Sequence, residues 1–391
     1  TGSSGPCTLV DPHLLCLTAS SGVPLFSRGP ARPSFPVLGS LTGVHMFGAG
    51  QGAELLSCVG LGGGLVVWRV FVDSVMLIAV GNREEEELQR LLDNVWGAMV
   101  LVLGLDQLTH IRNVERLKKE LRCCFFLIDH LLEEDQGEFL GALTHYPDCV
   151  VPADRAVLQT AVDASSRTLD SEFCCLLVGG RLAVATERWW SLSALELVLL
   201  STLTRISSGS GSDRPVFLPH SSPSVPLRLL SFTLLTGAMV CALCGPGPAL
   251  QEARGGLTLC WAPVFQNLRE GVSQQSALGP VSMRSELLAL VLISRATTRS
   301  VSWVTPHPQT LTRRHCWELL RYFYAYCWTR VFSLDLDRPL QTYMTTDECK
   351  SYAVHTHTHT LCVIAPPTVP TPTLRAAATH TLTNISTALG L

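Results

Sequence analysis

Residues 84–132 have the sequence EEEELQRLLDNVWGAMVLVLGLDQLTHIRNVERLKKELRCCFFLIDHLL. The part from 88 to 103 is apolar on nearly every side, which is typical of a helix covered by a sheet and by a neighbouring helix. Four consecutive glutamates stand in its first turn, where negative charge stabilises the positive end of the helix dipole. From 111 to 132, apolar residues recur every three or four positions and charged residues fill the gaps, which predicts a second, amphipathic helix. Gly104 and Asp106 supply the break between the two helices.

The bulk composition indicates a globular protein with more than one domain. A chain of 391 residues is too long for one ordinary hydrophobic core, so two or three domains are expected. Hydrophobic residues make up 47% and charged residues 16% of the chain, which excludes a disordered protein. The formal net charge is -3 and there is no basic block, whereas sequence-independent nucleic-acid binding needs clustered lysine and arginine. We therefore expect no nucleic-acid partner.

Apolar runs that contain cysteine indicate buried structure and no membrane span. The start of the sequence shows no signal peptide, so a cytoplasmic location with reduced thiols is expected for the 15 cysteines. Cys241 and Cys244 form an isolated CxxC pair, which we interpret as part of the core.

The apolar run from 229 to 244 is shorter than the roughly 20 residues of a spanning helix. Two buried strands joined at Thr236 and Gly237 are expected instead, with no transmembrane segment. Peripheral membrane association stays open.

One order of elements recurs along the chain. Residues 13–28 and 172–187 each contain two short apolar runs around a turn of small residues, as in a β-hairpin. In both rounds a helix, three further strands and a helical segment follow, which gives the order ββαβββα. A third round begins at 285 with a hairpin and a helix that extends to 332. Hairpins with helices on either side of a five-stranded sheet describe an α/β sandwich of the longin type.

The predicted fold class is therefore α/β, with three longin-like domains. Each is expected to hold a five-stranded, mainly antiparallel sheet flanked by helices. We predict the first domain at 10–135, a linker with a short helix at 136–170, the second domain at 171–270 and the third at 285–391.

The segment 352–372, YAVHTHTHTLCVIAPPTVPTP, departs from this pattern. On a strand, His355, His357 and His359 would share one face, as in a zinc-binding surface. A CA dinucleotide repeat translated in frame also encodes alternating histidine and threonine, and read-through of non-coding sequence is the preferred interpretation. We therefore expect an incomplete third domain, degraded around 345–372, and no metal site.

No arrangement of residues typical of an enzyme is found in the sequence. The glycines at 48–52 and 60–64 lack the lysine and the serine or threonine that complete a phosphate-binding loop. His45 and His220 have no serine, cysteine or aspartate at a spacing that supports a catalytic site. We predict a protein without catalytic residues and without a cofactor.

Several segments resemble the tri-longin family, which includes subunits of the Mon-Ccz and Hermansky-Pudlak exchange complexes. The most specific are RNVERLKKEL at 112–121 and ATERWW at 185–190, and the resemblance covers about 13–340 and resumes near 374. It implies a scaffold that pairs with an Inturned-like longin protein in a ciliogenesis and planar polarity effector complex.

The same resemblance implies binding to Rab-like small GTPases, together with other subunits of that complex, as part of a guanine-nucleotide exchange factor in cilium assembly. The implied location is the cytoplasm and the cytoskeleton, at the basal body of the cilium. A second function class stays open, namely a vesicle-trafficking adaptor or tether subunit without exchange activity.

Partner-binding residues are expected on the first hairpin, on a helix at 37–47 and on the charged face of 112–122, because an exposed sheet edge can pair with a partner strand. The adjacent tryptophans Trp189 and Trp190 are a further candidate, since tryptophan is enriched at binding hot spots. The candidate residues are Val23, Leu25, Leu38, Leu41, Arg112, Arg116, Lys119 and Trp190. The competing interpretation is a solvated helix face for the basic residues and core packing for the tryptophans.

Overall fold

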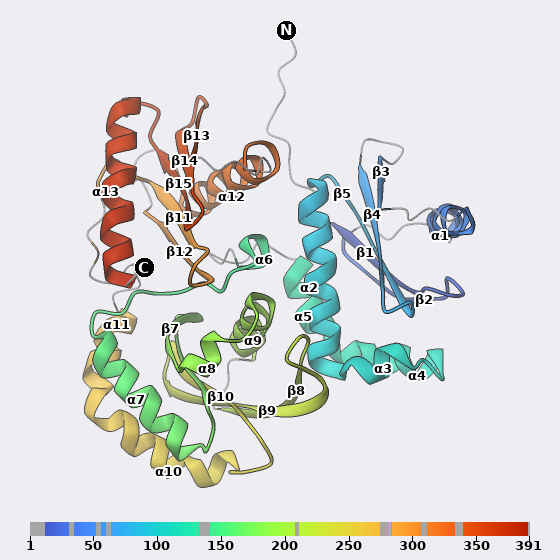
Figure 1. Cartoon of the computed structure of the whole chain (residues 1–391), viewed down its shortest axis with the longest axis horizontal. Helices are drawn as coiled ribbons and strands as arrows, with labels where there is room; N and C mark the ends of the chain where they lie inside the picture. Colours follow the sequence, from blue (N-terminus) through green and yellow to red (C-terminus); the bar gives the residue numbers. More distant parts are fainter. Residues whose placement is uncertain are drawn as a thin grey trace. The chain divides into compact units, whose positions relative to one another are not determined.

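The computed structural model contains three five-stranded sheets among its described residues (Figure 1). It describes residues 12–30, 35–51, 56–59, 64–132, 141–207, 211–273, 281, 284–305, 311–332 and 339–389. The chain divides into two compact units, of which the first holds residues 1–136 and 216–226 and the second holds the remainder. The predicted α/β class, with three five-stranded sheets flanked by helices, is confirmed.

The first sheet has the strand order β2-β1-β5-β4-β3. Its strands are β1 (His13–Thr18), β2 (Pro24–Arg28), β3 (Ser57–Val59), β4 (Leu65–Phe71) and β5 (Val75–Gly81), and each pairs antiparallel with its neighbours. All six residues of β1 are buried, which requires cover on both faces of the sheet. Helix α1 (Phe35–Gly50) covers one face, and α2 (Glu85–Leu103) with α5 (Phe125–Leu132) covers the other (Figure 1).

The segment 84–132 forms helices as predicted, with one difference. Helix α2 begins at Glu85 and ends where Gly104 takes a φ of 81°. After the short α3 (Leu105–Thr109), the amphipathic stretch folds as α4 (Val114–Glu120), a 3-10 turn η1 (Leu121–Cys124) and α5 in direct succession. The Asn113 side chain accepts a hydrogen bond from the Arg116 N–H at 3.0 Å, so this stretch begins at a capping residue and not at Ile111.

The second sheet repeats the topology in the order β7-β6-β10-β9-β8. Its strands are β6 (Phe173–Val178), β7 (Arg181–Ala185), β8 (Ser212–Leu218), β9 (Ser222–Leu235) and β10 (Ala238–Cys244). The run from 229 to 244 forms β9 and β10 as predicted, with Gly237 at a φ of 89° in the turn. Within the described residues, no helix is long and apolar enough to cross a membrane.

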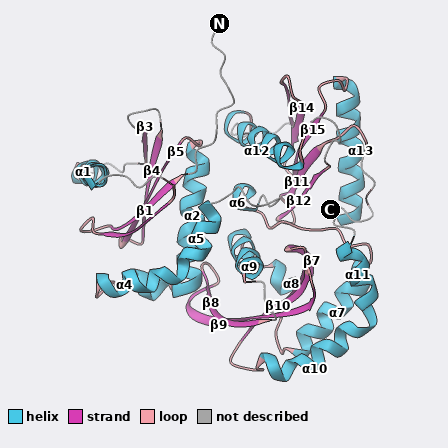
Figure 2. Ribbon diagram, turned by 180° about the vertical axis from the view of Figure 1, so that it is seen from behind, coloured by secondary structure: helices cyan, strands magenta, loops and turns pink. Residues whose placement is uncertain are grey.

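The helices of the second sheet lie on both of its faces (Figure 2). They are α7 (Arg155–Thr168), α8 (Glu187–Trp190), α9 (Ala194–Ile206), α10 (Leu250–Trp261), the 3-10 turn η3 (Ala262–Val264) and α11 (Phe265–Ser273). Helix α7 lies in the segment predicted as a linker and packs into the core of the second sheet through Leu158 and Val162.

The third sheet is complete, so the prediction of an incomplete, degraded third domain is wrong. Its order is β12-β11-β15-β14-β13, with strands β11 (Ala289–Ser294), β12 (Arg299–Val304), β13 (Leu340–Thr345), β14 (Lys350–His355) and β15 (His359–Ala365). Helices α12 (Arg313–Arg330) and α13 (Thr371–Leu389) flank it.

The histidine-threonine repeat lies at the turn between β14 and β15. The Thr356 N–H donates to the His359 carbonyl at 2.8 Å and its hydroxyl accepts from the His359 N–H at 3.0 Å. The sequence prediction weighed the unusual composition of the repeat, whereas a central strand needs only a short apolar run. The apolar residues on either side of the repeat supply such runs, and Tyr352, Leu361 and Val363 are buried.

Residues 147–150 join the second and third sheets by lying between two edge strands. The Ser300 N–H in β12 donates to the Pro147 carbonyl at 3.1 Å, and the Cys149 N–H donates back to the Ser300 carbonyl at 2.8 Å. On the other side, the Leu182 N–H in β7 donates to the Asp148 carbonyl and the Val150 N–H donates to the Leu182 carbonyl, both at 2.9 Å. One extended segment therefore covers the outer edges of two sheets.

Candidate partner-binding surface

Helix α1 presents an apolar surface on the outside of the first sheet. It has sixteen residues, none of them acidic, lysine or arginine. Its inner side packs Leu41 against the core cluster that includes Leu15 and Trp68. On its other sides the structure leaves large side chains exposed, with exposed fractions of 45% for Val37, 51% for Val44, 48% for Met46 and 72% for Phe47. An apolar patch of this kind on one helix is typical of a protein-binding surface.

Two glycines of α1 have no explanation within the described part of the chain. A Cβ atom added to Gly39 or Gly43 would meet no other atom within 4 Å. A glycine inside a helix costs about 0.5–1 kcal/mol relative to alanine, and no contact in the described chain offsets this cost at Gly39 or Gly43. The open space beside these positions fits a partner that packs closely on α1.

Strand β2 offers a free edge beside this helix. It is the outermost strand of the first sheet, and its outer side pairs with no other strand in the described residues. The equivalent outer strands of the other two sheets, β7 and β12, are covered by residues 147–150. The turn before β2 touches α1, because a Cβ atom on Gly22, whose φ is 64°, would lie 2.5 Å from Thr42 Cγ2.

The inner face of β2 rests on the helices of the opposite layer. Arg28 Nε donates to Asp129 Oδ1 in α5 at 2.6 Å, and the Arg28 guanidinium lies 4.8 Å from the centre of the Phe125 ring. The rings of Phe26 and Phe125 meet edge to face at 5.4 Å. These contacts hold β2 in place, so its edge is a preformed surface.

Helix α4 places basic side chains near the same strand. It lies against β2, and Arg112, Arg116 and Lys119 are exposed on or just before it. Arg116 Nε pairs with Glu120 at 2.7 Å, while neither Arg112 nor Lys119 has an ion-pair partner among the described residues. The surface thus combines an apolar helix, a strand edge and positive charge.

Three family descriptions match this chain. The first, second and third longin domains of FUZ, MON1 and HPS1 match residues 12–131, 169–259 and 286–388, respectively. Curated relatives named Protein fuzzy homolog agree over nearly the whole chain. The relative from Xenopus tropicalis is 40% identical over 94% of this chain and 96% of its own length. Those from Rattus norvegicus and Homo sapiens are 40% and 39% identical over 97% and 95% of this chain, and over 98% and 96% of their own lengths.

The chain belongs to the fuzzy family of tri-longin proteins.

The residues predicted for partner binding in this fuzzy-family chain lie in two places. Val23, just before β2, is half-buried and Leu25 is 6% exposed, so Leu25 serves the core in this structure. Leu41 is half-buried on the inner side of α1, and the side chain of Leu38 lies outside the described residues. These four residues and the basic residues of α4 all belong to the first longin domain. Their role in binding stays a prediction.

Trp190 lies elsewhere, at the end of α8 beside the second sheet. Its ring is half-buried, and the Arg299 guanidinium lies 3.8 Å from the ring centre. Its neighbour Trp189 is 1% exposed and packs in the core.

Sequence reasoning missed the exposed residues of α1, namely Val37, Val44, Met46 and Phe47. The helix at 37–47 was predicted as a partner-binding element, but the residues chosen on it were Leu38 and Leu41, and Leu41 packs against the core. The available signal was that the helix α1 contains no acidic residue, no lysine and no arginine.

Proposed function

We propose that this chain is a non-catalytic longin subunit of a ciliogenesis and planar polarity effector complex. It pairs with an Inturned-like longin protein, and the pair binds and regulates Rab-like small GTPases in cilium assembly, as part of a guanine-nucleotide exchange factor. Its place of action is the cytoplasm, at the cytoskeleton of the basal body. Membership of the fuzzy family and the three longin domains support this proposal.

The single observation that carries the pairing is the uncovered surface of the first longin domain. Helix α1 exposes Val44 and Phe47, and β2 leaves its edge unpaired in the described residues. A second longin sheet that places its own edge strand against β2 would extend the sheet by main-chain hydrogen bonds. The apolar side chains of α1 would then form the buried centre of the interface, where most of the binding energy arises.

The proposed nucleotide exchange requires no catalytic side chain. An exchange factor binds the GTPase more tightly in a state that holds Mg²⁺ and phosphate weakly, and thereby lowers the affinity for nucleotide. A scaffold of two longin proteins can supply such differential binding through surface contacts alone. The proposed mechanism therefore requires no covalent catalysis by this chain.

Co-expression and nucleotide-release assays test the proposal. The full chain is purified with an Inturned-like partner, and release of a fluorescent nucleotide from candidate Rab-like GTPases is followed with the pair and with each subunit alone. We expect a stable 1:1 pair that accelerates release from at least one GTPase. Failure to bind any longin partner would refute the pairing. Pairing with tether proteins but with no GTPase would instead support an adaptor in vesicle traffic.

A further inference from the structure

The hairpin of β8 and β9 extends past the strand that pairs with it in the second sheet. Of the fourteen residues of β9, only the part from Arg228 to Leu235 pairs with β10. Residues 216–226, named here the hairpin tip, belong to the first compact unit, whereas the rest of the hairpin belongs to the second. The hairpin tip therefore comes from the second longin domain in sequence but packs with the first.

The ring of Phe217 in the hairpin tip packs on the backbone of Gly104. Gly104 is buried between α2 and α3 and has a φ of 81°, which a residue with a side chain rarely adopts. A Cβ atom at this position would lie 2.9 Å from Phe217 Cε1 and 3.0 Å from Cδ1 and Cζ, so the ring fills the space that a side chain would need. A glycine by itself permits many backbone conformations, and the packed ring restricts this one.

Two polar residues of the hairpin tip act on the same two helices. Ser224 Oγ donates to Asp106 Oδ1 in α3 at 2.8 Å. Burial raises the pKa of Asp93 in α2, while nearby positive charge, including that of His220, lowers it. Asp93 and Gly104 are separated by about three helical turns, so they lie on one side of α2. The hairpin tip thus follows one side of α2 and continues onto the start of α3.

The turn at Gly104 affects the direction of the basic segment that follows it. Helix α3 has five residues, of which only Leu108 is buried, so few of its own side chains hold it against the domain. Helix α4 comes next and carries Arg116 and Lys119 of the candidate partner-binding surface. It also packs against β2, so its position depends on that contact and on the turn at Gly104.

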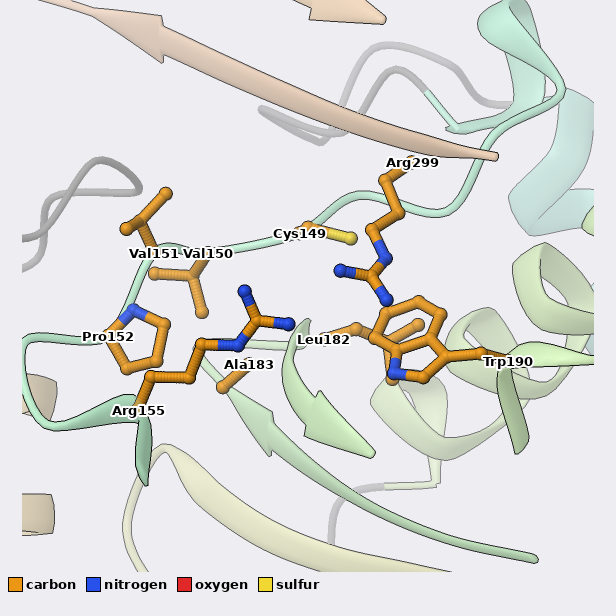
Figure 3. Close-up of a pocket in the computed structure, with 9 residues that line it drawn as sticks. All are labelled: Cys149, Val150, Val151, Pro152, Arg155, Leu182, Ala183, Trp190 and Arg299. Atoms are coloured by element: carbon orange, nitrogen blue, oxygen red, sulfur yellow. The ribbon is translucent and has the colours of Figure 1, made fainter. Parts of the chain in front are cut away.

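Contacts of a different kind hold the second and third longin domains together in the other compact unit. There residues 147–150 form main-chain hydrogen bonds with two strands, and the Arg299 guanidinium stacks 3.8 Å from the centre of the Trp190 ring (Figure 3). The contacts that Phe217, His220 and Ser224 make in the first unit come from side chains. Single substitutions in the hairpin tip can therefore remove them.

We propose that the hairpin tip is a clamp through which the second longin domain fixes the turn between α2 and α3, and with it the basic helix α4. Phe217 restricts the backbone of Gly104, and Ser224 holds the first turn of α3. A fixed α4 presents its basic side chains to a partner in one orientation, so less entropy is lost on binding. Without the clamp, residues 105–120 open locally more often while the rest of the domain stays folded. The role in partner binding rests on the proposed function, whereas the clamp itself does not.

Hydrogen exchange of the full chain, followed by mass spectrometry of its peptides, tests the clamp. Phe217→Ala removes the ring, and Ser224→Ala removes only the hydrogen bond to Asp106. Val225→Ala is the matched control, because Val225 lies on the same hairpin tip and is 65% exposed. We expect exchange in peptides of 105–120 to be about tenfold faster in Phe217→Ala and about threefold faster in Ser224→Ala, with no change in Val225→Ala.

The location of the faster exchange decides the outcome. Equal exchange of residues 105–120 in the wild type and all three variants would overturn the clamp. Equally faster exchange in peptides of β11 and β15 in Phe217→Ala would also overturn it, because the ring would then serve overall stability. Ser224 is exposed, so Ser224→Ala is expected to fold normally and keeps the test valid if Phe217→Ala folds poorly.

Calorimetric titration with the longin partner tests the link from the clamp to binding. The Kd should be about fivefold higher for Phe217→Ala than for the wild type and unchanged for Val225→Ala. An unchanged Kd together with faster exchange in Phe217→Ala would overturn this link. If the wild type binds no longin partner, the proposed function fails, and the exchange data still decide whether the clamp exists.

Discussion

Substitution of Phe47 by aspartate tests the role of α1. The Phe47 side chain is 72% exposed, and a buried aromatic side chain hides about 150–250 Å², so a partner could cover on the order of 140 Å² of it. At ~25 cal/mol per Å², this burial contributes up to about 3.5 kcal/mol to binding. Phe47→Asp removes this term and adds a charge that the partner must desolvate. We expect the Kd for the longin partner to rise by roughly two orders of magnitude.

The assay pairs a binding measurement with a stability measurement. Calorimetric titration of the purified chain with its longin partner gives the Kd, and urea unfolding of the chain alone gives the free energy of unfolding. Because Phe47 is exposed, the unfolding free energy should change by less than about 0.5 kcal/mol. Leu259→Asp is the matched control, since Leu259 is 76% exposed on α10 of the second domain. Unchanged affinity in Phe47→Asp, or an equal loss in both variants, would refute the reasoning.

Three further predictions concern stability. Gly43→Ala should raise the free energy of unfolding by about 0.5–1 kcal/mol in urea titrations, because the position is helical and open, and a loss of stability would show a hidden contact. Ser165→Ala should lower it by about 1–3 kcal/mol, because the buried Trp261 Nε1–H donates to Ser165 Oγ at 2.8 Å; an unchanged value would mean that water replaces the hydroxyl. Burial lowers the pKa of His355 and His359, so the unfolded chain binds more protons and the unfolding free energy should fall as the pH drops below about 6.5. Denaturation at pH 7.5 and 5.5 should show a smaller difference in the His355→Gln, His359→Gln double variant, and an equal difference would contradict this assignment.

The order of helices and strands could be predicted from local sequence patterns. Two short apolar runs around Gly179 and Gly180 predicted the hairpin of β6 and β7. The three-to-four spacing after Gly104 predicted helical structure in the segment that covers the first sheet. Such patterns arise from the two-residue repeat of a strand and the 3.6-residue repeat of a helix, which act within one element. The recurrence of one element order was enough to predict three similar domains, and the RNVERLKKEL segment was enough to indicate the family.

The third domain shows where local patterns mislead. The repeat that contains His357 has an unusual composition, but the chain places it at a turn, where composition matters little. The short apolar runs on either side form central strands because β11 supplies a paired neighbour for β15. Pairing with a strand some seventy residues earlier in the chain cannot be inferred from the repeat itself.

The amino-acid sequence determined the elements of this protein, their order and the family to which it belongs. Tertiary structure decided which surfaces those elements leave uncovered. Residues 147–150 close two sheet edges while the β2 edge has no partner in the described chain, and Arg155 meets Arg299 only because that segment brings two domains together. The physical reason is the sequence distance over which each property is set. The periodicity of a helix or strand depends on residues within one element, whereas exposure and charge pairing depend on segments that meet only in the folded chain.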